Sequence, residues 1–264
     1  TQINIVIGGM IASLQDGAVS WLFYADRLYE LPLAIVGIAI GVVLLPDISR
    51  HLRAGDTAAV MDAQNRSLEF AMFLTVPAAV ALATIPHEII RVLFERGAFK
   101  PSDTVSVASA LSLFAIGLPA FVMIKVFSPA FFAREDTKTP MRFATISLTA
   151  NTAGSVGLFF LFRELGMKPH LGIAVATTLG GWLNAVLLWR ALVGKGHFQA
   201  DARLRRTLPR IVLASLVMGA VLWGLAVALE PWLASANTIL VRVCALAAIV
   251  TAGLLTYAIA AQIT

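Results

Sequence analysis

Five polar residues interrupt an apolar stretch near the start of the chain. The stretch covers residues 18–45, and the five residues that form the candidate group within it are Ser20, Tyr24, Asp26, Arg27 and Glu30. At about 100° of rotation per residue on a helix, Asp26, Arg27 and Glu30 fall within an arc of about 100°, and Ser20 and Tyr24 precede Arg27 by two turns and one turn. The spacing predicts one polar helix face that carries two carboxyl groups and one guanidinium group.

Arg27 is the most informative member of this group. It lies about 13 Å along a helix from the start of the stretch, which places it near the middle of a lipid bilayer. Because an isolated charge in hydrocarbon is costly, an intramembrane Arg usually faces a bundle interior or a watery cavity and marks the route of a polar substrate. We therefore expect a transport role for this face.

A static ion pair is the alternative role for Arg27. The partner would be Glu30 or a carboxylate on a neighbouring helix, and the pair would fix helix packing without contacting a substrate. The transport role is favoured because two acids and one base on one face leave polar capacity that local pairing does not exhaust.

Three further polar residues are secondary candidates for a cavity lining. Lys125 has apolar neighbours on both sides, yet it lies close enough to the end of its span for the amine to reach the headgroups. The amine can therefore face either the cavity or the membrane surface, and both placements stay open. Asn151 and Asn184 belong to polar stripes with helical spacing. Hydrogen bonding between helices is the favoured role for both asparagines.

The composition places these residues in membrane-spanning elements. Of 264 residues, 59% are hydrophobic and 13% are charged, and the mean hydropathy is +0.85, far from the averages of soluble domains. Seven stretches are long enough to cross a bilayer and one, at residues 1–14, is shorter. The seven are residues 18–45, 67–85, 105–128, 140–162, 171–193, 209–229 and 237–261. The expected fold class is an all-α integral membrane protein, a polytopic bundle of transmembrane helices.

Prolines are expected to mark several helix ends. Pro46 is predicted to close the first long span, Pro209 and Pro231 to bracket the sixth, and Pro140 to lie in the first turn of its helix. Residues 56–66 are predicted to form a polar helical lead-in. Residues 86–99 are predicted to form a short amphipathic helix at the membrane surface.

The loop charges predict an orientation. Alternate connections at residues 46–66, 129–142 and 190–210 carry twelve Lys and Arg residues, whereas the connections on the other side carry five. The first set is therefore expected to be cytoplasmic, together with the C-terminus. This asymmetry accounts for the basic balance of the chain without any nucleic acid as partner.

Several classes of function are disfavoured. The four histidines have no second His or carboxylate at ligand spacing, so we expect no metal site. The chain has no Gly-rich phosphate loop and no nucleophile with a partner base at a recognisable spacing, so we expect neither an enzyme nor a cofactor. A coupling ion acting through Asp26, Glu30 or Lys125 and a dependence on membrane potential both stay open.

Four blocks of the chain form a recognisable series: Gln2–Asn4, Tyr24–Pro32 followed by Gly37–Pro46, Val126–Pro140 and Trp182–Ala185. In the same order, they resemble segments of the MurJ/MviN lipid II flippases, a family of the MOP transporter superfamily. The family has fourteen helices in two six-helix lobes plus a final pair. The resemblance implies that residues 1–193 are the C-terminal transporter lobe, from the end of helix seven to helix twelve. Residues 194–264 would be a basic cytoplasmic linker and the last two helices, which would form a groove for a lipid tail.

The resemblance also implies a function. The chain would be the C-terminal half of a transporter that moves lipid II from the cytoplasmic to the periplasmic leaflet of the bacterial inner membrane by alternating access. The head group of the undecaprenyl-linked precursor would be a disaccharide-pentapeptide pyrophosphate. Arg27 would attract its pyrophosphate, because a guanidinium presents several donors to phosphate oxygens. Asp26, Glu30, Ser20 and Tyr24 would line the same cavity. The partners would be this precursor, membrane lipids and the N-terminal lobe, which is absent from the chain.

Two alternative functions remain open from the sequence. One is a membrane scaffold or assembly protein that transports nothing, in which Arg27 forms only a structural ion pair. The other is a MOP-type exporter of a different lipid-linked or amphiphilic substrate.

Overall fold

The computed structural model describes residues 2–234 and 237–263, and this part of the chain forms ten helices and no strand. The helices are α1 (Gln2–Ala12), α2 (Ala18–Arg53), α3 (Thr57–Thr84), α4 (Pro86–Phe94), α5 (Pro101–Phe132), α6 (Lys138–Glu164), α7 (His170–Gly194), α8 (Ala202–Ala228), α9 (Glu230–Leu233) and α10 (Ile239–Ile263). Among the described residues, seven helices are long and apolar enough to cross a membrane: α2, α3, α5, α6, α7, α8 and α10. The predicted fold class and the seven predicted full spans are confirmed.

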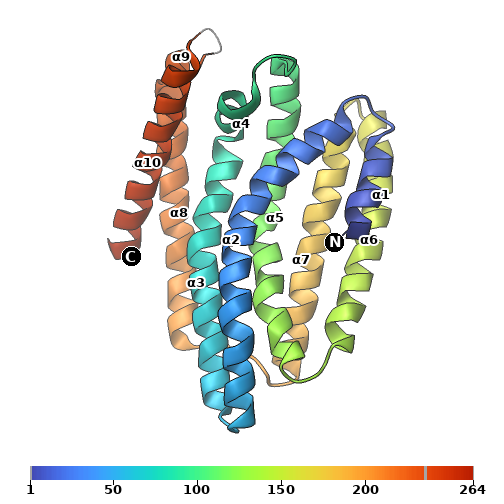
Figure 1. The fold of residues 1–264 in the computed structure, drawn as a ribbon, viewed down its shortest axis with the longest axis vertical. Helices are drawn as coiled ribbons and strands as arrows, with labels where there is room; N and C mark the ends of the chain where they lie inside the picture. The colour runs from blue at the N-terminus through green and yellow to red at the C-terminus, as the bar shows by residue number, and fades with distance from the viewer. Residues whose placement is uncertain (1, 235–236, 264) are drawn as a thin grey trace.

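The long helices run side by side and alternate in direction (Figure 1). The connections α2–α3, α5–α6 and α7–α8 lie together at one end of the bundle, drawn at the bottom of Figure 1. These are the three connections rich in Lys and Arg, so we call this end the basic end. The turns around α4, α6–α7 and α9 lie at the opposite end.

Two expected helix boundaries at prolines are wrong. Helix α2 continues through Pro46 to Arg53, and α8 begins at Ala202, about two turns before Pro209. Asp201 starts α8 because its side chain accepts a hydrogen bond from the amide of Leu204 at 2.6 Å. A proline inside a helix removes one backbone hydrogen bond, and a membrane helix tolerates this loss where neighbours or water satisfy the freed carbonyl.

Three other predicted boundaries have mixed outcomes. Pro140 lies in the first turn of α6, as predicted, and the lead-in at residues 56–66 is helical but belongs to α3 itself. The surface helix is shorter than predicted, because α4 ends at Phe94. A turn with Gly97 at φ +61° then leads into α5, and this left-handed backbone favours glycine.

Helix α5 lies at the centre of the bundle and packs against α2, α3 and α7. Helix α6 packs on α7 at one edge, where Gly172 faces the backbone of Leu158 so closely that an added Cβ would lie 2.6 Å from the Leu158 carbonyl carbon. Small residues permit such close approach between membrane helices.

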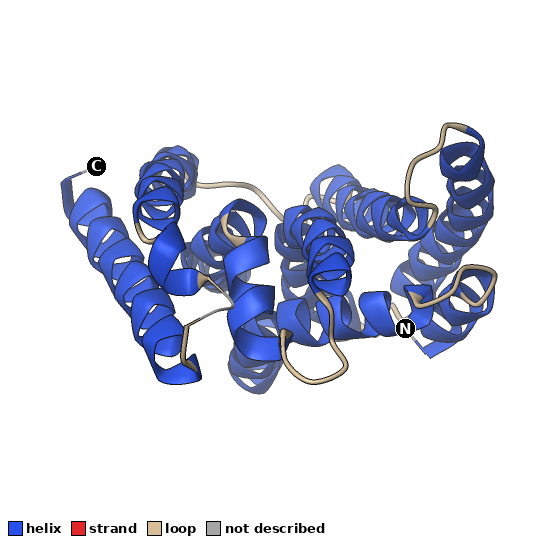
Figure 2. Ribbon diagram, turned by 90° about the horizontal axis from the view of Figure 1, so that it is seen from above, coloured by secondary structure: helices blue, strands red, loops and turns tan. Residues whose placement is uncertain are grey.

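Helices α8 and α10 form a pair at the other edge, which is clear in the view from above (Figure 2). They contact the bundle through α3 and α4. The Tyr257 hydroxyl of α10 donates to the carbonyl of Phe73 in α3 at 2.8 Å, and the buried Arg242 of α10 donates to the carbonyl of Arg91 in α4.

Candidate functional site

Arg27 is an exposed residue on the polar face of α2. Its Nη1 donates to Glu30 Oε2 at 3.1 Å, and the two side chains are 61% and 37% exposed. The guanidinium carbon lies 4.9 Å from the centroid of the Phe23 ring, within the range of a cation–π contact. One ion pair within the helix and one ring leave most of the guanidinium surface open.

Glu30 and Asp26 line a cavity of about 200 Å³ beside Arg27. The cavity is bounded by α1, α2, α5 and α7, and Thr177 of α7 contributes a hydroxyl to its wall. Tyr29 closes one side, where its ring lies 5.2 Å from the Phe114 ring and 5.8 Å from the Phe121 ring. We call this space the carboxylate cavity.

Ser20 and Tyr24 line a different cavity, of about 500 Å³, and not the one that Asp26 and Glu30 line. Tyr24 and Asp26 are about 160° apart around the helix at 100° per residue. The Tyr24 ring packs against Phe94 and Phe99, at 4.9 Å and 5.4 Å between centroids. Arg27 lies on α2 between the two cavities.

Lys125 is exposed on α5, and its methylene groups contact α2 at Gly37. A Cβ added to Gly37 would lie 3.9 Å from Lys125 Cγ. Gly37 follows Glu30 by seven residues, or two helical turns, so it shares the helix face of Glu30. The Lys125 stem therefore lies beside the helix face of Glu30, two turns further along α2.

The two candidate asparagines lie away from Arg27. Asn151 is buried between α6 and α7, where its Oδ1 accepts a hydrogen bond from Ser155 Oγ at 3.1 Å. A Cβ added to Gly180 of α7 would lie 3.0 Å from the Asn151 Cβ. The Asn184 Oδ1 is buried and has no hydrogen-bond partner among the described residues.

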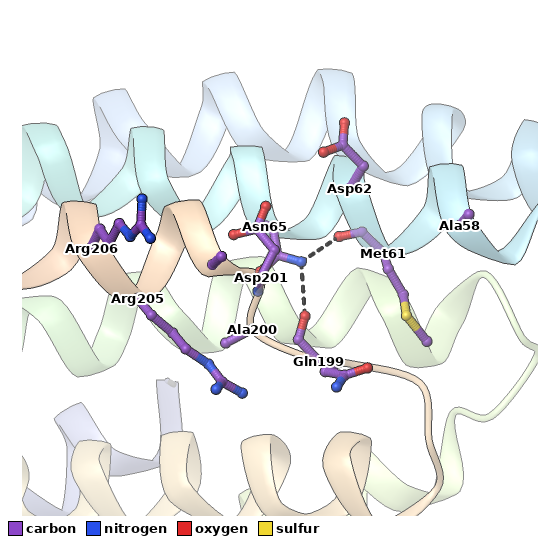
Figure 3. Close-up of a pocket in the computed structure, with 10 residues that line it drawn as sticks. Ala58, Met61, Asp62, Asn65, Gln199, Ala200, Asp201, Arg205 and Arg206 are labelled. Carbon is purple, nitrogen blue, oxygen red and sulfur yellow. Dashed lines mark hydrogen bonds between the residues drawn. The ribbon is translucent and has the colours of Figure 1, made fainter.

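A larger cavity, which sequence reasoning missed, lies at the basic end. Its volume is about 650 Å³, and it is formed by the start of α3 and the segment that leads into α8 (Figure 3). The Asn65 Nδ2 group donates to the carbonyls of Met61 and Gln199, at 2.9 Å each, and so ties the two segments together. Arg205 and Arg206 line the cavity from α8. The cluster of arginines in residues 203–210 is the sequence signal that points to this cavity.

An ion-pair network holds the same two segments together. Arg66 of α3 contacts Glu69 on its own helix and Asp201 before α8, and Arg203 Nε lies 3.2 Å from Glu69. No group of three or more His, Cys, Asp or Glu residues suitable for a metal ion occurs in the part of the chain that the structure describes.

Seven long apolar helices, one of which carries an exposed guanidinium beside two carboxyl groups, define the class of polytopic α-helical membrane proteins. Comparison with known families identifies the member of this class. Residues 1–253 match the family described as "Lipid II flippase MurJ", so the chain belongs to the MurJ family. The resemblance found in the sequence is confirmed, and the family with its seven apolar helices indicates a multi-pass protein of the inner membrane.

Curated relatives support this assignment. A "Probable lipid II flippase MurJ" of Rhizobium tropici is 46% identical over 261 residues, which are 99% of this chain and 48% of the relative. A protein of the same description from Rhizobium meliloti (strain 1021) is 50% identical over 226 residues, or 84% of this chain and 41% of the relative. The chain thus spans about half the length of the relatives it matches.

Solved structures share the fold. "Lipid II flippase MurJ, inward closed conformation" superposes with a TM-score of 0.75 at 27% identity, covering 99% of this chain and 50% of that chain. A multidrug resistance MATE family transporter of the MOP superfamily superposes with a TM-score of 0.54 at 18% identity, covering 97% and 60% of the two chains. The second likeness concerns the fold alone.

Proposed function

We propose that this chain is the C-terminal half of a lipid II flippase and that Arg27 binds the pyrophosphate of the lipid-linked precursor during translocation. In this proposal residues 1–193 form one lobe of the transporter, and α8 and α10 form an additional pair. The second lobe of the family fold would supply the opposite wall of the substrate path. Alternating access between the two lobes would then carry the head group across the membrane.

The exposure of Arg27 carries the proposal. Its side chain is 61% exposed on a long apolar helix, although such a charge is costly in hydrocarbon. A watery path between two lobes removes this cost. The exposed donors then match the oxygens of a pyrophosphate, which Arg binds in a fork geometry.

A purely structural ion pair is poorly supported by the geometry. The partner of Arg27 among the described residues is Glu30, three residues away on α2 itself. A pair within one helix fixes no contact between helices, and an exposed pair of this kind contributes about 0.5 kcal/mol or less. The energetic case for retaining an intramembrane Arg as a scaffold element is therefore weak.

The charge distribution supports an orientation for the proposed transporter. The basic end, with Arg205 and Arg206 beside its cavity, would face the cytoplasm. Helix α10 runs toward that end, so the C-terminus would also be cytoplasmic (Figure 1). Ser20 and Tyr24 would then lie on the periplasmic side of Arg27.

The direct test replaces Arg27 at the chromosomal gene. Arg27→Ala and Arg27→Lys should both abolish export of lipid II while protein accumulation in the membrane stays normal, because Lys cannot reproduce the two-pronged geometry. Arg163→Ala is a matched control, since Arg163 is an exposed arginine at the end of α6. Normal export in both Arg27 variants would refute the proposal. Loss of the protein from the membrane would show instead that Arg27 is needed for folding.

A further inference from the structure

The cavity that Ser20 and Tyr24 line is rich in aromatic side chains. It lies at the end of the bundle opposite to the basic end, between the start of α2, the end of α4 and the start of α5. Four aromatic residues line it: Trp21, Tyr24, Phe94 and Phe99. We call it the aromatic pocket, and its volume of about 500 Å³ lies within the usual range for small-ligand sites.

The aromatic rings are held in fixed positions. Trp21 Nε1 donates to Asp103 Oδ1 at 2.9 Å, and the indole lies against Gly17, where an added Cβ would lie 2.8 Å from Trp21 Cζ2. The ring centroids of Phe94 and Phe99 lie 6.1 Å apart, and both rings contact the Tyr24 ring. The pocket therefore presents rigid ring surfaces.

Polar groups border these rings. Asp103 already accepts hydrogen bonds from Trp21 and from the Lys100 amide at 2.9 Å, yet each carboxylate oxygen has capacity for a further donor. Ser20 and Arg96 are exposed and line the pocket. The Arg96 side chain has no hydrogen bond or ion pair within the described residues, so its five donors are available.

The turn that carries Arg96 is anchored to the bundle. Glu95, which is buried, accepts a hydrogen bond from Thr104 Oγ1 of α5 at 2.5 Å. The amide of Phe99 donates to the Arg96 carbonyl at 3.2 Å, and Gly97 supplies the left-handed backbone between them. The donors of Arg96 thus belong to an ordered turn.

We propose that the aromatic pocket binds a carbohydrate, specifically the amino-sugar part of the head group whose pyrophosphate binds at Arg27. Aromatic rings have electron-rich faces that attract the C–H face of a pyranose. Asp103, Ser20 and Arg96 supply the acceptors and donors that sugar hydroxyl and acetamido groups need. The choice of an amino sugar rests on the proposed function.

The position of the pocket along α2 fits this assignment. Ser20 precedes Arg27 by seven residues, or about 10 Å along the helix. A disaccharide attached to a pyrophosphate at Arg27 can bridge this distance. The carboxylate cavity is less suitable for a sugar, because its volume is only about 200 Å³.

The test measures sugar binding without any lipid or phosphate. The chain is reconstituted in lipid nanodiscs and titrated with N,N′-diacetylchitobiose, a soluble amino-sugar disaccharide, by saturation-transfer NMR and calorimetry. Arg96→Ala should weaken binding about tenfold, the expected loss for a hydrogen bond from a charged donor. Arg163→Ala, an exposed arginine at the same end of the bundle, should leave the affinity unchanged.

A second pair of variants tests whether the aromatic ring of Tyr24 is needed for sugar binding. Tyr24→Phe keeps the ring and should retain binding, whereas Tyr24→Leu should lose most of it. Wild-type chain that does not bind the disaccharide, or wild-type affinity in both Arg96→Ala and Tyr24→Leu, would overturn the proposal. Arg96→Ala keeps the result interpretable if Tyr24→Leu disturbs the packing with Phe94 and Phe99.

Undecaprenyl pyrophosphate, which carries no sugar, distinguishes this inference from the proposed function. Arg27→Ala should weaken binding of this lipid and leave the disaccharide affinity unchanged, and Arg96→Ala should do the opposite. Loss of disaccharide binding in Arg27→Ala would count against a separate sugar pocket. Binding of the lipid that depends on Arg27, without any disaccharide binding, would refute the pocket and leave the pyrophosphate site in place.

Discussion

Arg27 and Glu30 are joined by a 3.1 Å ion pair, and Glu30 at the same time lines the carboxylate cavity. Glu30 therefore has two effects on an anion that approaches Arg27. It orients the guanidinium, and its own negative charge competes with the anion for the same donors. The second effect leads to a prediction that runs against the usual expectation for a binding-site substitution.

Glu30→Gln should strengthen the binding of undecaprenyl pyrophosphate. The substitution removes one competing charge from a partly exposed position, and the expected gain is about fivefold, equivalent to about 1 kcal/mol. Binding can be measured on the chain in nanodiscs. Glu164→Gln, at an exposed carboxylate at the end of α6, should change nothing. Weaker binding in Glu30→Gln would mean that Glu30 chiefly orients Arg27.

Asp136 should make the stability of the basic end depend on pH. Its Oδ2 lies 2.7 Å from Lys195 Nζ, and Thr139 donates to its carboxylate from both the amide and the hydroxyl. The hydrogen bond from Lys195, followed by those from Thr139, lowers the pKa of Asp136 to about 2. Because the folded pKa lies below the unfolded value of about 3.9, this stabilisation is complete above about pH 4 and is lost as the pH falls toward 2.

The difference in thermal stability between wild type and Asp136→Asn should therefore shrink as the pH falls from 4 toward 2. Thermal unfolding in detergent at several pH values measures it. Glu135→Gln provides the control, since Glu135 is the exposed neighbour. Its difference from wild type should stay constant over this range. A constant difference for Asp136→Asn as well would contradict the assigned pKa.

Arg66→Met should lower the free energy of unfolding by about 2 kcal/mol. The guanidinium of Arg66 contacts Glu69, whose side chain is only 14% exposed, and Asp201, which caps α8. Removing it leaves these carboxylates with fewer partners at the junction of α3 and α8. Arg205→Met is the control, because Arg205 is an exposed residue of the neighbouring cavity. Equal denaturant midpoints for the two variants would contradict a structural role for the network.

The architecture was largely predictable, because apolar runs long enough to cross a bilayer form helices whatever lies around them. Hydropathy marks where apolar residues end, however, and not where a helix ends. Helix α2 passes Pro46 into a polar turn, which Asp47 and Arg50 support with an ion pair of 2.5 Å. The boundary predicted at Pro46 was wrong for this reason.

The sequence indicates individual candidate residues of the site, but it does not predict how their side chains are arranged in space. Arg27 is recognisable because its charge lies deep in an apolar run. The division of the polar face depends on Phe94 and Phe99, which meet Tyr24 only because the turn after α4 folds over α2. Helical periodicity contains no information on a contact between residues that lie about seventy positions apart in the sequence. The roles of Asn151, Asn184 and Lys125 stay predictions for the same reason.

The contact between α6 and α7 gives a prediction with a control inside the same pair of helices. A methyl group at position 172 would lie 2.6 Å from the carbonyl carbon, 2.7 Å from the carbonyl oxygen of Leu158 and 2.8 Å from the amide of Phe159. Because these are backbone atoms, no side-chain rotation relieves the overlap and the helices must separate. Gly172→Ala should therefore lower the free energy of unfolding by about 2 kcal/mol.

Gly157→Ala is the matched control, because nothing lies within 4 Å of a Cβ added there on α6. Alanine has the higher helix propensity, so this variant should be as stable as wild type or more stable, by up to about 1 kcal/mol. Thermal unfolding of both variants in the same detergent separates the two effects. Similar losses in both variants would contradict the role assigned to the close contact at Gly172. A loss confined to Gly172→Ala would show that the close approach of α7 to α6 is the requirement.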